Sequence, residues 1–468
     1  MEANASTRAS AIESVESGEP IERAFRDEWT AVVATLARRL GDLQLAEDAT
    51  QEAFARAAVA WPRDGAPAKP GAWLTVSAWR IALNHLRHDQ FVVASADDLA
   101  ESQALPSSDR DEAPTLIEEQ EENLGMEDDR LRLIVTCCHP ALALEARVAL
   151  TLRYVAGLTT REIASAFLLP EPTLAQRLVR AKRKIRQAGI HFELPAPADL
   201  AMRIAGTQRV IYLVFNEGYS ASGGADLVRV DLCAEAIWLG RMLRRLTPDD
   251  AETTGLLALM LLLHARTPSR QRADGRPIAL AEQDRSRWRQ DVIAEGVALL
   301  DDALQLRAPG AYQTQAAIAA LHAQAPSFEA TDWLQIALLY RQLARLAPSP
   351  VVEINRAVAV GMADGPRAGL AVLEPILTSG QLDDYAPLHA AHADLLDRSG
   401  EVDAATVAWG RALAATENEA LRAELARRVA ARTPGAPANP TEVPAEQINP
   451  MAETRTIPID QEDQNSPT

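Results

Sequence analysis

The side chains with the most distinctive chemistry are cations crowded into one short stretch. The sequence "PTLAQRLVRAKRKIR", residues 172–186, carries six Arg and Lys residues and no acidic one. A dense positive surface attracts polyanions, above all the phosphates of nucleic acid. The stretch therefore predicts nucleic-acid binding, with a solvated basic face on an ordinary helical hairpin as the alternative. The cations are Arg177, Arg180, Lys182, Arg183, Lys184 and Arg186.

Thiols and imidazoles are the other reactive groups, and their spacing does not favour catalysis. Cys137 and Cys138 are adjacent in "TCCHP", whereas zinc sites use separated ligands such as C-x-x-C. Cysteine prefers burial, so we interpret both as helix core. His389 and His392 share a helix face without a third ligand nearby. We expect no metal, no cofactor and no catalytic residue, and a metal-dependent enzyme is the less favoured alternative.

The composition predicts an all-α protein without a membrane segment. The chain has 468 residues, of which 47% are hydrophobic and only 4% aromatic, and helix formers dominate. Its longest apolar run, Leu256–Leu263, is too short to cross a bilayer. The first twenty residues lack the apolar core of a signal peptide, and three cysteines favour a reducing, cytoplasmic location.

Charge is distributed unevenly along the chain. The net charge is −18, but residues 130–188 hold 11 basic and 3 acidic side chains, which gives +8. Just before them, residues 94–129 hold 1 basic and 13 acidic side chains, which gives −12. The acidic total therefore hides one basic module beside an acidic linker, and this asymmetry favours polyanion binding by the basic module.

Two predicted helices position the basic stretch. Thr159 or Thr160 is suited to cap the first helix, and Pro172 is favourable at the first position of the second. Apolar residues spaced four, three and four apart predict the buried stripe of the second helix. They are Leu174, Leu178, Ala181 and Ile185. This layout is a helix-turn-helix, whose second helix enters a major groove while its later cations contact phosphates. The residues expected at base edges are Glu171, Thr173, Ala175, Gln176 and Arg177.

The rest of the chain divides into helical modules and linking segments. Near the C-terminus, "GEVDAATVAWGRAL" (residues 400–413) has the spacing of the second half of a tetratricopeptide repeat, and residues 364–377 resemble it. We expect these repeats to stack into a solenoid with a concave face. The expected divisions are a disordered 1–20, helical modules at 21–93 and 130–190, an acidic flexible linker at 94–129, a helical extension at 198–431, and a disordered Pro-rich tail at 432–468.

The basic stretch also resembles a known family. "LTTREIASAFLLPEPTLAQRLVRAKRKIR", residues 158–186, is similar without gaps to the last domain of extracytoplasmic-function (ECF) sigma factors of RNA polymerase. Two positions depart from the family pattern, because Leu168 replaces the turn glycine and Pro172 replaces the glycine before Thr173. The matching positions are Leu158, Glu162, Ile163, Ala164, Pro170, Thr173, Arg177, Leu178, Arg180, Ala181 and Arg186.

The resemblance extends to "DLQLAEDATQEAFARAAVAW", residues 42–61. In this family the corresponding helix docks on the clamp helices of the polymerase β′ subunit. The resemblance implies that role for Asp48, Gln51, Glu52 and Phe54. The alternative is a generic amphipathic helix with a solvated acidic face.

Residues 72–88, "AWLTVSAWRIALNHLRH", resemble the regions that open and read the −10 element. An aromatic ring can stack on an unpaired base, although tryptophan in such a helix is more often core. The preceding loop, Pro62–Pro70, matches the place where family members capture a flipped base. The candidates for DNA contact are Trp73, Trp79, Arg80, Asn84, His85 and Arg87.

Together these segments imply an alternative sigma factor, with the resemblance covering roughly residues 21–431. The extension is similar to that of one subgroup described as tetratricopeptide-like, which implies a regulatory role and a protein or polymerase partner. The implied partners are promoter DNA and core polymerase, at its β′ clamp helices and β flap, with no membrane and no catalysis by this chain. The acidic linker either mimics RNA in the polymerase channel or serves as a solvated tether. A helix-turn-helix regulator that binds duplex DNA alone is the second alternative.

Overall fold

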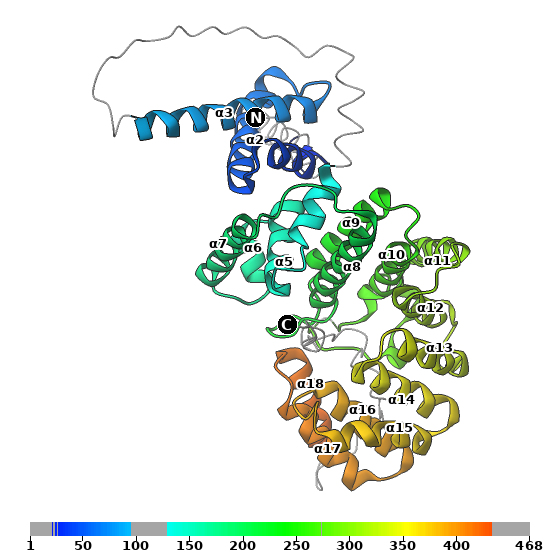
Figure 1. Ribbon diagram of the computed structural model, residues 1–468. Helices are drawn as coiled ribbons and strands as arrows, with labels where there is room; N and C mark the ends of the chain where they lie inside the picture. The colour runs from blue at the N-terminus through cyan, green and yellow to red at the C-terminus, as the bar shows by residue number, and fades with distance from the viewer. Residues whose placement is uncertain (1–20, 22–23, 26, 95–128, 273, 433–468) are drawn as a thin grey trace, which may run out of the picture. The chain divides into compact units, whose positions relative to one another are not determined.

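Every regular element in the described part of the chain is a helix, which confirms the all-α prediction (Figure 1). The computed structural model describes residues 21–94, 129–272 and 274–432, apart from 22, 23 and 26. The predicted disordered segment 1–20 lies outside these residues, and so do the predicted linker except residues 94 and 129 and the predicted tail except residue 432, which is helical. In the described ranges, no helix is long and apolar enough to cross a membrane.

The chain divides into two compact units, which we treat separately. The first comprises residues up to Ser165 together with Leu169–Val210, and the second comprises Ala166–Leu168 and the residues from Ile211 onwards. The first unit contains two small helical modules. The first module contains the helix 27–40, α2 (Leu43–Asp64) and α3 (Pro70–Ala94). The second module contains the helix 129–137, α5 (Leu144–Leu150), the π-helix η1 (Thr151–Val155), α6 (Thr160–Ala166) and α7 (Glu171–Gln187).

In the first module α2 and α3 form a packed helical pair. Asp42 begins α2, because its carboxylate accepts hydrogen bonds from the backbone N–H groups of Gln44 and Leu45, 2.8 and 3.1 Å away. The loop predicted at Pro62–Pro70 is shorter than expected, since α2 continues through Pro62 to Asp64 and α3 begins at Pro70. Pro62 lies in the last turn of α2, and the connection to α3 is only residues 65–69.

The second module is built around a small apolar core. Leu133, Leu150 and Leu152 are fully buried, and so are the two adjacent cysteines. Cys137 ends the helix 129–137 and Cys138 follows it, with its Sγ 3.4 Å from Thr151 Oγ1. Burial raises the pKa of both thiols. The interpretation of these cysteines as core residues is therefore confirmed.

Successive helices of the second unit follow a curved path from α9 to α18 in Figure 1. Neighbours pack as pairs, such as α14 with α15 and α16 with α17. The bounds are α8 (Pro197–Tyr219, which spans both units), α9 (Val230–Leu246), α10 (Ala251–His264), α11 (Gln290–Gln305), α12 (Ala311–Gln324), α13 (Trp333–Leu346), α14 (Pro350–Asp364), α15 (Pro366–Ser379), α16 (Ala386–Ser399), α17 (Val402–Ala414) and α18 (Glu419–Arg432), with three short 3₁₀ turns between α10 and α11 at Thr267–Ser269, Leu280–Glu282 and Arg285–Arg287.

The repeat pattern near the C-terminus corresponds to helical hairpins. Gly400 ends α16 in the left-handed conformation, with φ 86°, and α17 follows with Trp409 fully buried. In the preceding hairpin, a Cβ on Gly369 would lie 2.6 Å from the carbonyl oxygen of Ala357, so only glycine permits this close approach of α15 to α14. The repeat spacing therefore marks two consecutive hairpins.

The last hairpin also contacts the start of the same unit. The Asn418 side-chain amide donates hydrogen bonds to the carbonyl oxygens of Ala221 and Asp226, at 3.2 and 3.0 Å. The backbone N–H of Glu419 donates to the carbonyl of Gly224 at 3.0 Å. The start of α18 therefore contacts the loop after α8, and the second unit closes on itself.

Candidate nucleic-acid interface

A reciprocal hydrogen-bond pair fixes the start of the helix-turn-helix. The Thr159 hydroxyl accepts from the backbone N–H of Glu162 at 3.1 Å, and the Glu162 carboxylate accepts from the backbone N–H of Thr159 at 2.7 Å. This is a capping box, which satisfies N–H groups that no helical partner can reach. Of the two residues predicted as caps, Thr159 fills the role and Thr160 is the first residue of α6.

Helix α7 buries the stripe that its sequence predicts. Its four buried residues are Leu174, Leu178, Ala181 and Ile185, with 2 to 5% of each exposed. Pro170 precedes the helix in an extended conformation, and Pro172 lies in its first turn. The predicted buried face of this helix is therefore confirmed.

One residue in the turn between α6 and α7 has a left-handed backbone conformation although it is not glycine. Leu168 has φ 52°, a conformation that non-glycine residues seldom adopt, and about half of its side chain is exposed. The family pattern has glycine at this position. The substitution therefore leaves the left-handed turn in place instead of removing it.

The predicted DNA-contacting side chains of α7 lie mostly at its surface. Of the residues predicted at base edges, Glu171, Ala175 and Gln176 are exposed, whereas Thr173 and Arg177 are half-buried. Of the later cations, Lys182 is half-buried and the rest are exposed: Arg180, Arg183, Lys184 and Arg186. The helix therefore presents a mixed polar start and a basic end to solvent.

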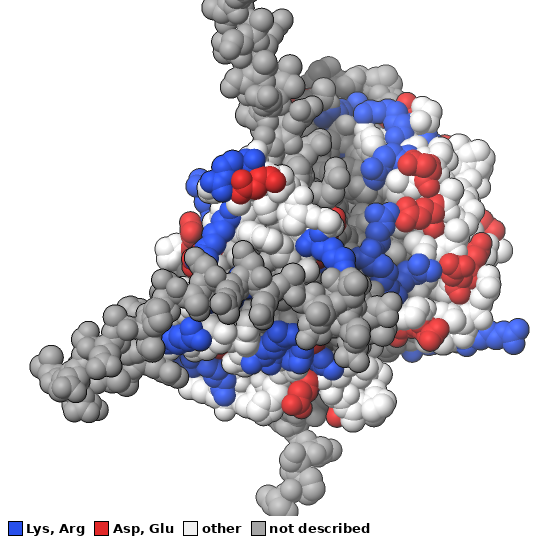
Figure 2. Space-filling view, turned by 90° about the horizontal axis from the view of Figure 1, so that it is seen from above, with Lys and Arg blue, Asp and Glu red and all other residues white. Residues whose placement is uncertain are grey.

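The cations of α7 form no ion pair with any carboxylate in the part of the chain that the structure describes. Arg180 donates only a long bond, 3.4 Å, to the carbonyl of Gln176 in its own helix. Figure 2 shows Lys and Arg side chains in groups on one face of the molecule, with Asp and Glu side chains among them. Unpaired surface cations retain their full attraction for an external polyanion, which suits phosphate contacts.

Helix α2 presents three of its four predicted polymerase-binding residues. Asp48 and Gln51 are exposed, and Glu52 is half-buried and accepts a hydrogen bond from Arg56 at 2.6 Å. Phe54 differs, since only 6% of it is exposed.

The Phe54 ring lies within an aromatic cluster. Its centroid is 5.1 Å from that of Phe25 and 5.9 Å from that of Trp29. In this arrangement the Phe54 ring helps to hold α2 against the helix 27–40. The expected contact of Phe54 with polymerase stays a prediction.

The candidate −10 residues of α3 fall into two groups. Trp73 and Trp79 are half-buried, and each ring has a neighbour: Trp61 lies edge-on to Trp73, with centroids 5.7 Å apart, and the Arg39 guanidinium lies 5.6 Å from the Trp79 ring. The other four side chains are exposed, and they are Arg80, Asn84, His85 and Arg87. His85 lies 3.5 Å from Glu52, so α3 and α2 share one polar surface.

The candidate metal ligands of the sequence do not come together in the described residues. Among the described residues, no three His, Cys, Asp or Glu side chains form a group that could hold a metal ion. His389 is buried, and its Nε2 lies 2.7 Å from the carbonyl oxygen of Asp383, so its ring serves packing.

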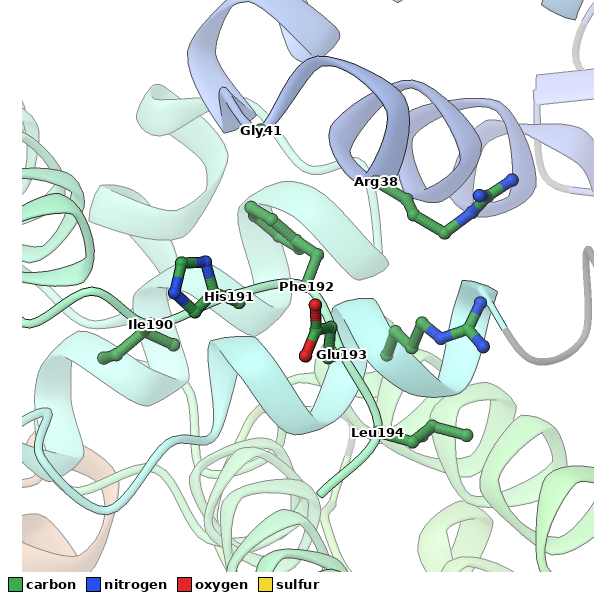
Figure 3. A pocket seen from close by; sticks show the side chains of 8 residues that line it. Arg38, Gly41, Ile190, His191, Phe192, Glu193 and Leu194 are labelled. Carbon is green, nitrogen blue, oxygen red and sulfur yellow. The ribbon is translucent and has the colours of Figure 1, made fainter. Parts of the chain in front are cut away.

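A cavity of about 570 Å³ lies in the first unit, between the helix 27–40 and the segment 190–194 (Figure 3). Phe192 and Glu193 lie in the middle of this view, with Arg38 nearby. Arg38 and Arg132 both donate to the buried carboxylate of Asp129, at 2.9 and 2.6 Å, so their charge is partly satisfied. The side chains of His191 and Glu193 line the same cavity.

Three family models match the chain. The model described as "Sigma-70 region 2" matches residues 25–91, and "Sigma-70, region 4" matches residues 132–185. A "Family of unknown function (DUF6596)" matches residues 203–304 in the second unit. No solved structure matches the chain.

Curated relatives fall into two kinds. The chain is 44% identical to "Uncharacterized protein R00370" of Rhizobium meliloti (strain 1021) over 82% of its own length and 89% of the relative. It is 30% identical to the "Probable RNA polymerase sigma-C factor" of Mycobacterium bovis over 31% of its own length and 69% of the relative. It is 29% identical to the "Probable ECF RNA polymerase sigma factor SigI" of Mycobacterium tuberculosis (strain H37Rv) over 37% of its own length and 56% of the relative.

Proposed function

Because the chain belongs to the ECF family of RNA polymerase sigma factors and carries a long C-terminal extension, we propose that it binds core RNA polymerase, directs it to promoters and begins transcription there. The observation that carries the proposal is the pairing of two modules in one chain. One matches sigma region 2, and the other presents an unpaired basic helix on a helix-turn-helix. A DNA-binding regulator that acts without polymerase has no use for the first module.

The first module would contact both polymerase and the −10 element. Asp48, Gln51 and Glu52 on α2 would face the β′ clamp helices. The exposed polar residues of α3 would contact the −10 strands, while Trp73 and Trp79 would have to leave their present neighbours to stack on a base. This chain would catalyse no reaction, because bond formation belongs to polymerase and the sigma subunit contributes binding energy.

The second module would read the −35 element while the polymerase β flap holds it. The start of α7 would enter the major groove with Glu171, Thr173 and Gln176 at base edges. The later cations would contact phosphates, so affinity would fall steeply with salt.

The second unit would regulate the factor. Its closed row of helical hairpins resembles repeat proteins that bind other proteins. The partner would be either a regulatory protein or a surface of polymerase itself.

Run-off transcription with purified core polymerase tests this proposal. Fragmented genomic DNA of the source organism serves as template, and new transcripts are mapped by sequencing. We expect discrete start sites that require both core polymerase and the full chain. The same assay with residues 200–468 deleted should change the yield at those sites if the extension regulates. Absence of new start sites, together with duplex binding by the chain alone, would favour an independent DNA-binding regulator.

A further inference from the structure

One face of α13, in the second unit, exposes apolar side chains next to cations. Leu334 and Leu338 lie one helical turn apart, and 59% and 46% of these residues are exposed. Arg341 and Arg345 continue the same line toward the end of the helix and are also exposed. At 3.6 residues per turn, the four positions fall within about 60° of one another around the helix axis. We call these four residues the α13 stripe.

The α13 stripe takes no part in the packing of its own helix. The buried residues Ile336, Tyr340 and Leu343 lie on the opposite side of α13, which packs against α12 and α14. The α13 sequence contains no acidic residue, and neither arginine of the stripe forms an ion pair with a carboxylate in the described ranges. The stripe therefore offers two apolar and two cationic contacts to a segment from elsewhere.

The C-terminal segment of the chain has the complementary pattern. Residues 433–468 follow α18 and lie outside the described residues, and they hold 6 acidic side chains and 1 basic side chain. Within them, the sequence "IPIDQE" places two isoleucines before two carboxylates, as the stripe places two leucines before two arginines. We call this set the tail motif, and its members are Ile457, Ile459, Asp460 and Glu462.

The two patterns have nearly the same spacing along their axes. At 1.5 Å per residue, the four positions of the α13 stripe lie at about 0, 6, 10.5 and 16.5 Å along the helix. In a polyproline II conformation, at about 3.1 Å per residue, the four positions of the tail motif lie at about 0, 6, 9 and 15.5 Å. Pro458 suits this conformation, because its ring fixes φ near −65°. Each isoleucine can therefore face a leucine while each carboxylate faces an arginine.

The angular arrangements also agree. Polyproline II has three residues per turn, so Ile457 and Asp460 share one face and the other two members of the tail motif share the next. Seven residues of an α-helix make nearly two turns, so Leu334 and Arg341 share one row of α13 and the other two members of the stripe share the next. Each row therefore pairs one apolar contact with one ion pair.

The tail motif is close enough in the chain to reach the α13 stripe. Ile457 lies 25 residues beyond Arg432, the last residue of α18, and a fully extended chain of that length spans about 80 Å. Five steps from helix to helix separate α18 from α13, which amount to at most about 50 Å at about 10 Å per step. Such a tether gives an effective concentration on the order of 1 mM, so even a weak contact is largely occupied.

We propose that the α13 stripe binds the tail motif of the same chain, so that the second unit carries its own ligand on this face. The contact buries two isoleucines against two leucines and places both carboxylates beside guanidinium groups. A protein that binds this face has to offer the same chemistry, an apolar pair followed by acidic residues, and has to displace the tail motif. The inference goes beyond the proposed function and does not depend on it, because the contact needs neither polymerase nor DNA.

Photo-crosslinking within the full chain tests the contact. The photoreactive residue p-benzoylphenylalanine replaces Gln342, which is exposed on α13 beside the stripe, and the irradiated chain is analysed by peptide mass spectrometry. At low protein concentration we expect cross-links within one chain to residues 455–464. The same photoreactive residue in place of Val407, which is exposed on α17, is the control. It should give less than about a tenth of these cross-links.

Charge reversal shows whether the ion pairs determine the contact. Arg341→Glu together with Arg345→Glu should reduce the yield of these cross-links about tenfold, because the carboxylates of the tail motif then meet like charges. Asp460→Arg together with Glu462→Arg should have the same effect for the converse reason. All four changes combined should restore most of the yield, because each ion pair forms again with its charges exchanged.

A second pair of exposed arginines provides the matched control. Arg245 and Arg367 lie on α9 and α15, and their change to Glu alters the net charge by the same amount. The cross-link yield from position 342 should then equal that of the native chain. Circular dichroism and thermal unfolding of every variant check that the helices persist.

Three results would overturn the proposal. The first is a set of cross-links from position 342 that avoids residues 455–464, and the second is a yield that charge reversal leaves unchanged. The third is cross-linking between two chains that increases with protein concentration, which would assign the stripe to the tail of a second copy. A chain that directs no transcription would contradict the proposed function but would leave the result of this test unaffected.

Discussion

Arginine serves opposite purposes in the two units of this chain. On α7, Arg180, Arg183 and Arg186 are exposed and have no carboxylate partner within the described residues. In the second unit, Arg266, Arg270 and Arg428 are buried, with 5 to 7% of each exposed. The same type of side chain is therefore exposed on α7 and enclosed at these three positions of the second unit.

The enclosed arginines are stabilised mainly by aromatic rings and hydrogen bonds. The Arg270 guanidinium lies 3.7 Å from the Tyr219 ring centroid and donates to the Tyr219 carbonyl, and Arg266 lies 5.3 Å from the ring of Trp288. Burial lowers the pKa of Arg270. Such arginines hold helices together, whereas those of α7 remain available to a polyanion. Whether an arginine here stabilises the fold or remains available to a ligand therefore depends on its burial and its partners, and not on the residue type.

The largest effect is expected where a buried arginine loses its counter-charge. Glu424 accepts hydrogen bonds from Arg427 and Arg428 at 2.6 and 3.2 Å, and Arg428 is buried against Trp409. Glu424→Gln should destabilise the last hairpin by about 3 kcal/mol. Hydrogen exchange of α17 and α18 measures this. Glu353→Gln removes the charge from a more exposed pair with Arg356 and should lower the stability by less than about 1 kcal/mol. Equal losses of stability in the two variants would contradict the distinction between buried and exposed arginines.

The arginines of α7 should affect binding and not stability. Changing Arg177, Arg180 and Arg183 together to Gln should weaken promoter binding by holoenzyme about 100-fold. It should also reduce the salt dependence of log affinity by about 0.9 per lost phosphate contact. Filter binding at several salt concentrations measures both quantities. The same change at Arg287, Arg341 and Arg345, which are exposed in the second unit, is the control and should leave both unaltered.

Acid should destabilise the second unit and not α7. Burial, with a smaller contribution from Arg289, lowers the pKa of His264 to about 4. His264 of the unfolded chain therefore binds a proton near pH 6.5, whereas His264 of the folded chain binds one only near pH 4. The free energy of unfolding therefore decreases as the pH is lowered from about 6.5 to about 4. At pH 5 the loss is about 2 kcal/mol. His264→Gln should reduce the acid loss by about this amount in pH-dependent urea unfolding, while the part due to His322, whose pKa burial lowers to about 3, should remain. His191→Gln, at an exposed site, should leave the acid loss of the second unit unaltered.

The smallest effect concerns the scaffold beneath the basic helix. Thr159→Ala removes the capping box of α6 and should cost about 1 kcal/mol in the stability of the second module. Thr160→Ala is the matched control, because Thr160 lies next to the cap and makes neither bond of the box. A thermal shift of equal size in both variants would show that the cap does not set the start of α6.

Local features of the fold were predictable from the sequence, because they depend on neighbours in the chain. The buried stripe of α7, the cap at Thr159 and the hairpin at Gly400 follow from helix periodicity and from turn chemistry. The helix continued through Pro62 because proline near a helix end removes few hydrogen bonds. Such features need no knowledge of the tertiary fold.

Long-range features were not predictable. Phe54 is predicted to contact polymerase, and only the structure shows that its ring packs on Phe25 and Trp29. Nothing in the sequence pairs Glu47 with Arg153, since the chain between them follows no local pattern that brings them together. Glu47 has polar neighbours in its helix, so the local sequence gives no indication that its carboxylate is buried.

Footprinting of promoter DNA by the reconstituted holoenzyme tests the central claim most directly. The account predicts two protected elements about 25 base pairs apart that appear only when core polymerase and this chain are combined. The Arg177, Arg180 and Arg183 triple variant should lose the upstream element alone. A single continuous site protected by the chain without polymerase, and unaffected by that variant, would contradict the account.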